Sequence, residues 1–246
     1  MIPPISFITR NGTKFTFPII EGGYRDLLQL TQPRAPLTTD WADVDGLDAV
    51  KQPLDTAPTR PIKLPFAANY AMAHTTIQNF TQLVYNGAEV RIQVTDVAEE
   101  PFNRFYLYTL SGNIKQDRVP TAGQELYKYA PQGKPYTLTD ARTSLADIGA
   151  TPLDGWHTAI HDKTHYKDTG RVAGRDCTIP ILLRGDTTEQ LLSSRAALER
   201  LLFAQARNLL ITPDGETDFY FTRSRIRGYA LSVTPYIIYD LTITLL

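Results

Sequence analysis

The strongest constraint in this 246-residue sequence is an internal repeat. The only two tryptophans lie 156 − 41 = 115 residues apart, and an arginine and a proline further along have counterparts at the same separation. Self-similarity at a fixed spacing indicates a structural unit that occurs twice, so it governs how the rest of the chain is interpreted. The anchors of the repeat are Trp41 and Trp156, Arg60 and Arg175, and Pro65 and Pro180.

The first half is predicted to contain a strand, a helix and further strands. Apolar positions alternate over 60–66, which indicates a strand that ends at its proline. The helix that follows ends at Gly87, since glycine suits the left-handed position after a helix. A strand covers 90–94, and 99–101 lies in a loop without a counterpart in the second half. The apolar face of the helix comprises Ile77, Phe80, Leu83 and Val84.

The second half is predicted to follow the same order. A strand covers 175–181, and Asp186 with Glu189 forms a capping box that begins a helix. This helix runs to about Ala206, with leucines 191, 198, 201 and 202 on one face, and a strand over 209–212 follows it. The last strand alternates two faces, with Ile237, Tyr239, Leu241, Ile243 and Leu245 on one and Asp240, Thr242 and Thr244 on the other.

The repeat predicts an α+β fold that is mainly β, with two similar domains, each with one helix packed on a sheet or sandwich. An aromatic stretch at 105–108 matches another at 219–222 with an offset of 114 residues, which supports the duplication. The predicted domains are 1–139, which includes an N-terminal strand pair or arm, and 154–246, joined by a linker over 140–153.

Composition and charge exclude several classes of protein. The chain has 25 basic and 26 acidic residues and a formal charge of −1, which argues against bulk electrostatic capture of nucleic acid or anionic membrane. Cys177 is the single cysteine, so an internal disulfide and a thiolate metal cage are excluded. Its apolar position in a strand predicts a buried structural thiol. Neither a signal peptide nor a membrane-spanning segment is expected.

A histidine cluster is the nearest approach to a metal site. His157, His161 and His165 are four residues apart, with Asp162 among them, and could hold zinc if they shared a helix face. The surrounding residues are poor helix formers, so a surface loop or an exposed strand is the preferred interpretation. The acidic turn at 43–48 lacks the glycine and glutamate spacing of a calcium loop. We expect neither a metal nor a cofactor.

Three arginines alternate near the end of the chain and are expected to face one side of a strand. Arg223, Arg225 and Arg227 form either a solvated face or a row that lines a pore for DNA or meets acids on a neighbouring subunit. The Arg-Gly-Asp tripeptide at 184–186 is interpreted as a strand-to-helix corner. Motifs for phosphate loops and nucleophile elbows are missing from the sequence, so we do not expect an enzyme.

Four stretches together resemble a known family. The proline-rich lead at 33–36, the acidic turn at 43–48, the arginine-led strand at 60–64 and the paired tyrosines within 105–112 resemble the opening domain of phage distal tail proteins. The duplication is similar to the two-domain organisation of baseplate hub proteins. This resemblance implies a tail-tube-like fold, with a β-sandwich or barrel flanked by a helix in each domain.

The same resemblance implies a structural role in the tail of a virion assembled in the bacterial host cytoplasm. The chain would form a homo-oligomeric ring of three or six copies that joins the tail tube to the hub. Implied partners are the tail tube protein, the tape measure, baseplate or receptor-binding proteins, and DNA passing through the lumen. The alternative is a carbohydrate- or ligand-binding β-sandwich, in which Trp41, Trp156 and Tyr166 stack on sugars.

Overall fold

The structure, a computed structural model, divides the chain into two compact units. The first unit combines residues 1–29 and 57–117, and the second combines 30–56 and 118–246. Both are dominated by antiparallel sheets with few helices, which confirms the α+β, mainly β prediction. The residues that the structure describes are 4–20, 22–33, 38–39, 48–49, 59–85, 88–116, 148–153, 175–203, 208–212 and 215–245.

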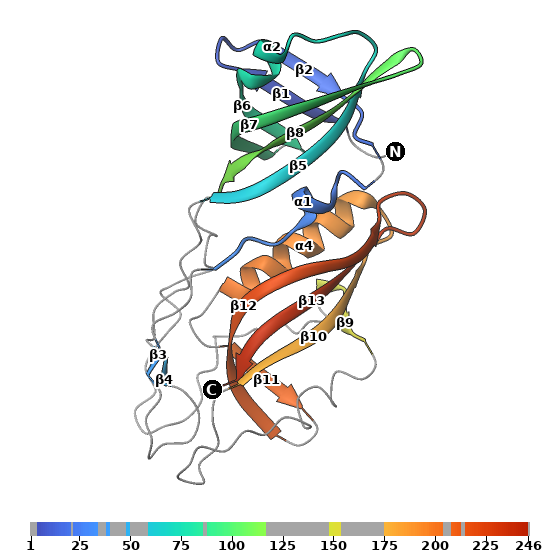
Figure 1. The fold of residues 1–246 in the computed structure, drawn as a ribbon. Coiled ribbons are helices and arrows are strands. Elements are labelled where there is room, and N and C mark those ends of the chain that lie inside the picture. The colour runs from blue at the N-terminus through green and yellow to red at the C-terminus, as the bar shows by residue number, and fades with distance from the viewer. Residues whose placement is uncertain are drawn as a thin grey trace. The chain divides into compact units, whose positions relative to one another are not determined.

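The first unit is built on a six-stranded sheet with the strand order β2-β1-β6-β7-β8-β5 (Figure 1, blue to green). Two short helices belong to it, α1 (Arg25–Leu28) and α2 (His74–Gln78). The predicted N-terminal strand pair is confirmed, and it is part of the sheet because β1 also pairs with β6. The strands are β1 (Ile5–Thr9), β2 (Lys14–Phe17), β5 (Thr59–Ala68), β6 (Phe80–Tyr85), β7 (Ala88–Phe102) and β8 (Phe105–Lys115).

The segment after β2 joins one side of this sheet to the other. Ile19 forms a β-bridge with Phe66 on β5, and the Ile20 N–H donates to the Pro65 carbonyl at 3.1 Å. Pro65 therefore lies inside β5, which was predicted to end there and instead runs to Ala68. Its carbonyl points away from β8, so its missing N–H costs no hydrogen bond to that strand.

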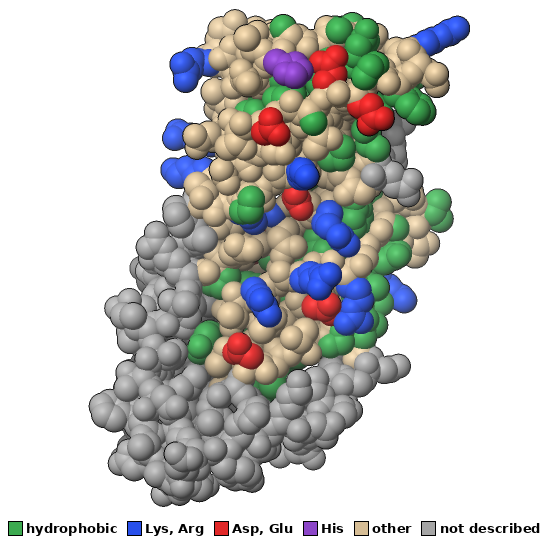
Figure 2. All heavy atoms as spheres, viewed as in Figure 1, with side chains coloured by type: hydrophobic (Ala, Val, Ile, Leu, Met, Phe, Trp, Pro, Cys, Tyr) green, Lys and Arg blue, Asp and Glu red, His purple; other side chains and the backbone are tan. Residues whose placement is uncertain are grey.

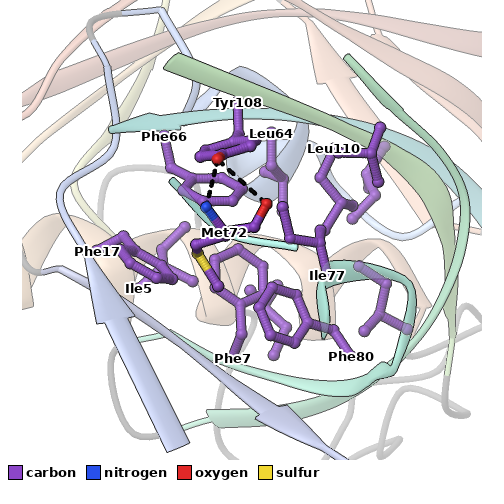
Figure 3. Close-up of a cluster of buried hydrophobic side chains, with 14 of the residues drawn as sticks. Ile5, Phe7, Phe17, Leu64, Phe66, Met72, Ile77, Phe80, Tyr108 and Leu110 are labelled. Carbon is purple, nitrogen blue, oxygen red and sulfur yellow. Dashed lines mark hydrogen bonds between the residues drawn. The ribbon is translucent and has the colours of Figure 1, made fainter. Parts of the chain in front are cut away.

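Aromatic side chains fill the interior of the first unit (Figure 3). Phe7 stacks on Phe80 with ring centroids 4.8 Å apart and contacts Phe66 at 5.2 Å. Tyr108 is fully buried, and its hydroxyl oxygen accepts a hydrogen bond from the Met72 N–H at 2.6 Å. The core comprises Ile5, Phe7, Phe17, Ile62, Leu64, Phe66, Ala68, Met72, Ile77, Phe80, Leu83, Ile92, Val97, Tyr108, Leu110 and Ile114.

The helix predicted to run through Phe80 and Leu83 ends at Gln78, so that part of the prediction is wrong. β6 begins at Phe80 instead, and the register shows that Thr81 has no partner residue on β1. This bulge lets both Phe80 and Leu83 reach the core although they are three residues apart. An irregular strand thus produces the apolar spacing that is typical of a helix. Gly87, the predicted helix end, lies outside the described residues.

The second unit is built on a five-stranded sheet with the order β11-β12-β13-β10-β9 and a single long helix, α4 (Thr188–Phe203), in its described part. As predicted, Leu191, Leu198 and Leu202 of α4 are buried, and Phe203 meets Phe221 of β12 edge to face at 5.9 Å. The strands are β9 (Ala150–Pro152), β10 (Arg175–Arg184), β11 (Asn208–Thr212), β12 (Gly215–Ala230) and β13 (Tyr236–Leu245), with a separate pair formed by β3 (Thr38–Thr39) and β4 (Asp48–Ala49).

The alternation predicted for the last strand is confirmed in β13. The five apolar residues from Ile237 to Leu245 are buried on the side that faces α4, and Cys177 of β10 lies beside Ile243 on that side as a buried thiol. On the opposite side of β13, Asp240 is half-buried, and Thr242 and Thr244 are buried like the apolar residues. Both hydroxyl groups form hydrogen bonds within the sheet, since Arg223 donates to Thr242 and Thr244 donates to Asp176.

The capping box of α4 lies one residue later than predicted. The Gln190 N–H donates to the Thr187 hydroxyl oxygen at 3.1 Å, so Thr187 rather than Asp186 caps the helix. The Gln190 side chain returns the interaction by accepting from the Asp186 N–H at 2.7 Å. Threonine followed by glutamine three residues later is a capping-box pair, so the predicted motif is present with different residues. The structure describes this helix as far as Phe203.

Four strands have the same order and register in both sheets. β5-β8-β7-β6 of the first unit corresponds to β10-β13-β12-β11 of the second. The proline of β5 and that of β10 lie in equivalent places, because each carbonyl accepts one hydrogen bond from a short segment on the outer side of its strand. The Ile20 N–H donates to Pro65 at 3.1 Å, and the Leu153 N–H donates to Pro180 at 2.9 Å.

A β-bulge also occurs at the same place in both sheets. Thr95 is the extra residue of β7 opposite β8, and Thr222 is the extra residue of β12 opposite β13. The offset between the units is 115 at the proline strands, 222 − 95 = 127 at the bulges and 239 − 108 = 131 at Tyr108 and Tyr239. The offset grows mainly because α4, with 16 residues, is longer than α2, with 5 residues.

The structure differs from four of the sequence predictions. The match of 105–108 with 219–222 is wrong, because the first begins β8, whose counterpart is β13, and the second lies in β12, whose counterpart is β7. Residues 99–101 are in β7 rather than in a loop. Within the predicted linker, Ala150–Pro152 forms β9 and pairs with β10. Residues 30–56, placed in the first domain by the sequence, group with the second unit.

Candidate interaction surfaces

The predicted arginine row lies on the side of the second sheet that faces away from α4. Arg223 and Arg225 are exposed and pair in register with Thr242 and Asp240 of β13. Arg227 occupies a second bulge of β12 and is also exposed. It reaches the same side, because its guanidinium binds Asp240. The three side chains therefore share one face, as the alternation predicted.

Their hydrogen bonds leave part of this positive charge available. Arg227 binds the Asp240 carboxylate through two nitrogens, Nη2 to Oδ1 at 2.6 Å and Nε to Oδ2 at 3.4 Å. Arg223 donates from Nε to the neutral Thr242 hydroxyl at 3.4 Å. Among the described residues, Arg225 has no carboxylate partner. Two of the three guanidinium groups can therefore meet an external anion.

Apolar and hydroxyl side chains surround the arginines. Pro180 and Leu182 of β10 and Ile238 of β13 have the same orientation and are half-buried, and Arg184 of β10 is exposed at the end of the face. Figure 2 shows basic side chains gathered here with acidic ones among them. We name this surface the basic face. Its mixture of guanidinium groups and partly buried apolar side chains resembles the composition of protein interfaces.

On the equivalent face of the first unit, β7 carries acidic residues where β12 has arginines, and the exposed Lys63 of β5 lies on the same face. With the offset of 127, Asp96 of β7 occupies the position of Arg223, and Ala98 that of Arg225. Glu100 follows on the same side of β7, opposite Leu107 of β8. Asp96, Ala98 and Glu100 are all exposed. Figure 2 shows acidic side chains over this unit.

The end of the β7–β8 hairpin adds two exposed aromatic rings. Phe102 and Phe105 pair across the strands and are 55% and 46% exposed, unusually high for such large apolar side chains. Asn103 begins the turn between them with φ 52°, a left-handed conformation that asparagine tolerates. We name the outward side of Asp96–Leu107 the acidic arm. The acidic arm was not predicted from the sequence, although an asparagine between two phenylalanines indicates a tight hairpin.

Several other side chains in the described part of the chain are exposed. Val233 is 88% exposed in the β12–β13 turn, between Ala230 and Tyr236, which are the counterparts of Phe102 and Phe105. Tyr70 is 54% exposed after β5. His74 Nε2 lies 3.1 Å from Glu99 Oε2, and both are accessible to solvent. The Arg-Gly-Asp corner lies between β10 and α4, as predicted.

The repeat anchors have structural roles where the structure describes them. Arg60 is buried, and its guanidinium donates to the Asp26 carbonyl. The backbone of Arg175 pairs with Leu245 at the equivalent end of β10. Trp41 and Trp156 lie outside the described residues.

The remaining candidate sites also lie outside the described part of the chain. They are the zinc candidates His157, His161, His165 and Asp162, most of the acidic turn at 43–48, and Tyr166 of the sugar-binding alternative. Within the described residues, no three His, Cys, Asp or Glu side chains group as metal ligands. These hypotheses therefore stay predictions.

No helix in the described ranges combines the length and the apolar character that crossing a membrane requires. No protein family, curated protein or solved structure matches this chain.

Proposed function

We propose that this protein is a structural ring component of a phage tail tip or baseplate, with two tail-tube-like domains that arose by duplication. The observation that supports this proposal most is the shared frame of four strands, with the same order, register, proline position and bulge. Bulges are retained features of a fold rather than random irregularities, so a shared bulge favours common descent of the units over chance similarity.

A duplicated sheet domain suits a ring because two units with one strand frame can occupy repeated positions around it. Sheets end in strands whose backbone groups have partners on one side only, and proteins must cover or pair such edges. In the second unit β11 and β9 are the terminal strands. In a closed ring, neighbouring units pair these edges, and rotational symmetry leaves none open. Three chains of two units, or six chains, would complete such a ring.

In this role the protein acts by position rather than by catalysis. The ring would connect the tail tube to the hub or receptor-binding apparatus and leave a lumen for DNA. The tape measure, tube and baseplate proteins would be its neighbours, and the virion tail its location. Turnover of a substrate and a bound cofactor form no part of the proposal.

The native mass of the purified protein tests the proposal directly. Light scattering or mass photometry over a range of concentrations, with negative-stain images of the large species, should show closed rings of three or six chains. Open filaments, or a monomer at the highest soluble concentration both alone and on tail tubes assembled from purified tube protein, would contradict the ring.

A further inference from the structure

We propose that the acidic arm of one copy of this chain packs against the basic face of a second copy. The occupant of the basic face would thus be Asp96–Leu107 of a neighbouring molecule. This inference rests on the proposed ring, since it identifies the contact that would join one chain to the next, but it makes its own predictions about named residues.

The acidic arm has the features of an inserted element. Every residue from Ala98 to Phe105 is exposed, so this end of the hairpin extends beyond the core of its own unit. Its outward side carries the carboxylates of Asp96 and Glu100, with Phe102, Phe105 and the half-buried Leu107 beside them. Large exposed aromatic side chains next to charges are typical of surfaces that become buried against a partner.

The basic face offers complementary groups. Arg223 and Arg225 present guanidinium nitrogens without a carboxylate partner among the described residues. Half-buried Leu182 and Ile238 provide apolar contact area next to them. A guanidinium group binds a carboxylate with two parallel hydrogen bonds, so arginine opposite aspartate or glutamate defines both the attraction and the orientation.

Charge complementarity selects a second copy as the occupant. The acidic and the basic residues stand at equivalent positions of the two sheets, since Asp96 corresponds to Arg223. Contact between two arms, or between two basic faces, would bring like charges together, which disfavours it. Contact between an arm and a basic face brings opposite charges together. Because the two surfaces differ, the contact is head to tail, and it closes into a ring when the rotation between copies permits.

Charge reversal and its compensation test this contact. One variant carries Asp96→Lys with Glu100→Lys, a second carries Arg223→Glu with Arg225→Glu, and a third carries all four changes. We expect each of the first two to weaken self-association roughly tenfold or more, because like charges then oppose each other. The third variant restores opposite charges with the signs exchanged and should recover most of the wild-type mass.

Two controls separate this effect from misfolding and from total charge. Lys14→Glu with Arg200→Glu gives the same charge change as the second variant at exposed positions away from both surfaces, and it should leave the mass unchanged. The neutral variants Asp96→Asn with Glu100→Gln, and Arg223→Gln with Arg225→Gln, should weaken association less than the reversals. Circular dichroism and thermal unfolding of every variant establish that the fold is intact.

The outcomes distinguish this inference from the proposed function. Wild-type rings that persist in both reversal variants, or losses that the fourfold variant does not recover, overturn the contact and leave the ring proposal standing. Open filaments or dimers that depend on the four residues support the contact and contradict the ring. A wild-type monomer under all conditions overturns both. If the arginine changes reduce only binding to duplex DNA and leave the mass unchanged, the basic face has a nucleic-acid role and the contact is overturned.

Discussion

In the first unit, the β1–β2 hairpin and the short α2 cover the apolar side of the four shared strands, whereas α4 covers that side in the second unit. The strands beneath the two covers have the same order and register. The aromatic cluster around Phe7 in one unit and the leucines of α4 in the other bury the same side of equivalent strands.

The comparison separates a strand frame that is kept from surfaces that vary. Backbone pairing depends little on which side chains are present, so strand order, register and bulge can persist while covers and outer faces change. The outer faces differ even in the sign of the charge at one position, because the first unit has Asp96 where the second has Arg223. In the ring that we propose, this difference would let two equivalent frames present complementary surfaces.

The largest effect is expected from removing the centre of each cover. Phe7→Ala should lower the unfolding free energy of the first unit by about 3–5 kcal/mol, because Phe7 contacts Phe66 and Phe80 in a closed core. Leu198→Ala, at a fully buried position of α4, should cost the second unit about 2–5 kcal/mol. Amide hydrogen exchange measured across a series of urea concentrations reports which unit has lost stability.

The exposed Val233→Ala serves as the control for both and should change stability by less than about 0.5 kcal/mol. If both core changes destabilised the same unit, the assignment of separate covers would be wrong.

A second pair of variants compares one frame position in the two units. Gly112 of β8 is equivalent to Ile243 of β13, but an added Cβ at Gly112 would lie 2.5 Å from the Gln93 carbonyl oxygen. Gly112→Ala should therefore cost about 1–3 kcal/mol through crowding, whereas Ile243→Ala should cost about 2–5 kcal/mol through a cavity. Chemical denaturation of both variants measures the two penalties.

If Gly112→Ala proved neutral, the backbones of β7 and β8 would be further apart than the structure shows. The backbone beside the bulge would then have to differ between the two units.

The buried hydroxyl of Tyr108 allows a smaller and pH-dependent test. Tyr108→Phe leaves the Met72 N–H without its 2.6 Å acceptor and should cost about 1–3 kcal/mol at neutral pH. Burial raises the pKa of Tyr108 above its ordinary value of 10.0, and the charge of Glu99 acts in the same direction. The folded state therefore keeps this proton at a pH where the unfolded chain has lost it.

The stability that follows from this difference is fully present below pH 10.0 and decreases as the pH rises through the raised pKa of the folded state. The advantage of the wild type over Tyr108→Phe should thus shrink above that pH, measured by denaturation at several pH values. Tyr106→Phe, on the same strand and only half-buried, is the matched control for the loss of a hydroxyl group. Parallel pH curves for the wild type and Tyr108→Phe would contradict the raised pKa.

The smallest effect is expected at the helix caps, where the units also differ. α4 has the Thr187 cap, whereas α2 begins after Ala73 without a side-chain cap. Thr187→Ala should lower the melting temperature of the second unit, with a loss of about 1 kcal/mol. Asp186→Ala should cost less, because only its backbone N–H takes part in the capping interaction. Equal losses of stability in the two variants would show that the Asp186 side chain, as first predicted, also caps the helix.

The residues themselves explain which predictions succeeded. The alternation in β13 and the leucine spacing of α4 are local patterns, and the predicted apolar side chains are buried except Leu201, which is half-buried. The buried Cys177 followed from the same alternation. β6 was predicted as a helix because Phe80 and Leu83 are three residues apart, and only pairing with β1 creates the bulge that brings both inward. A pattern within one segment cannot report a pairing made with residues more than seventy positions earlier.

The sequence by itself determined the mainly β class, the 115-residue spacing of the two proline strands, and the long helix with its apolar face, because alternation, helical spacing and fixed separation can be recognised without knowing the pairing of strands. Only the tertiary structure decided the true offsets between the units, the equivalence of β8 with β13, and the opposite charges at Asp96 and Arg223. Those features depend on strand register, which is set by hydrogen bonds between segments far apart in the chain, and a shift of one residue would turn every side chain to the other face.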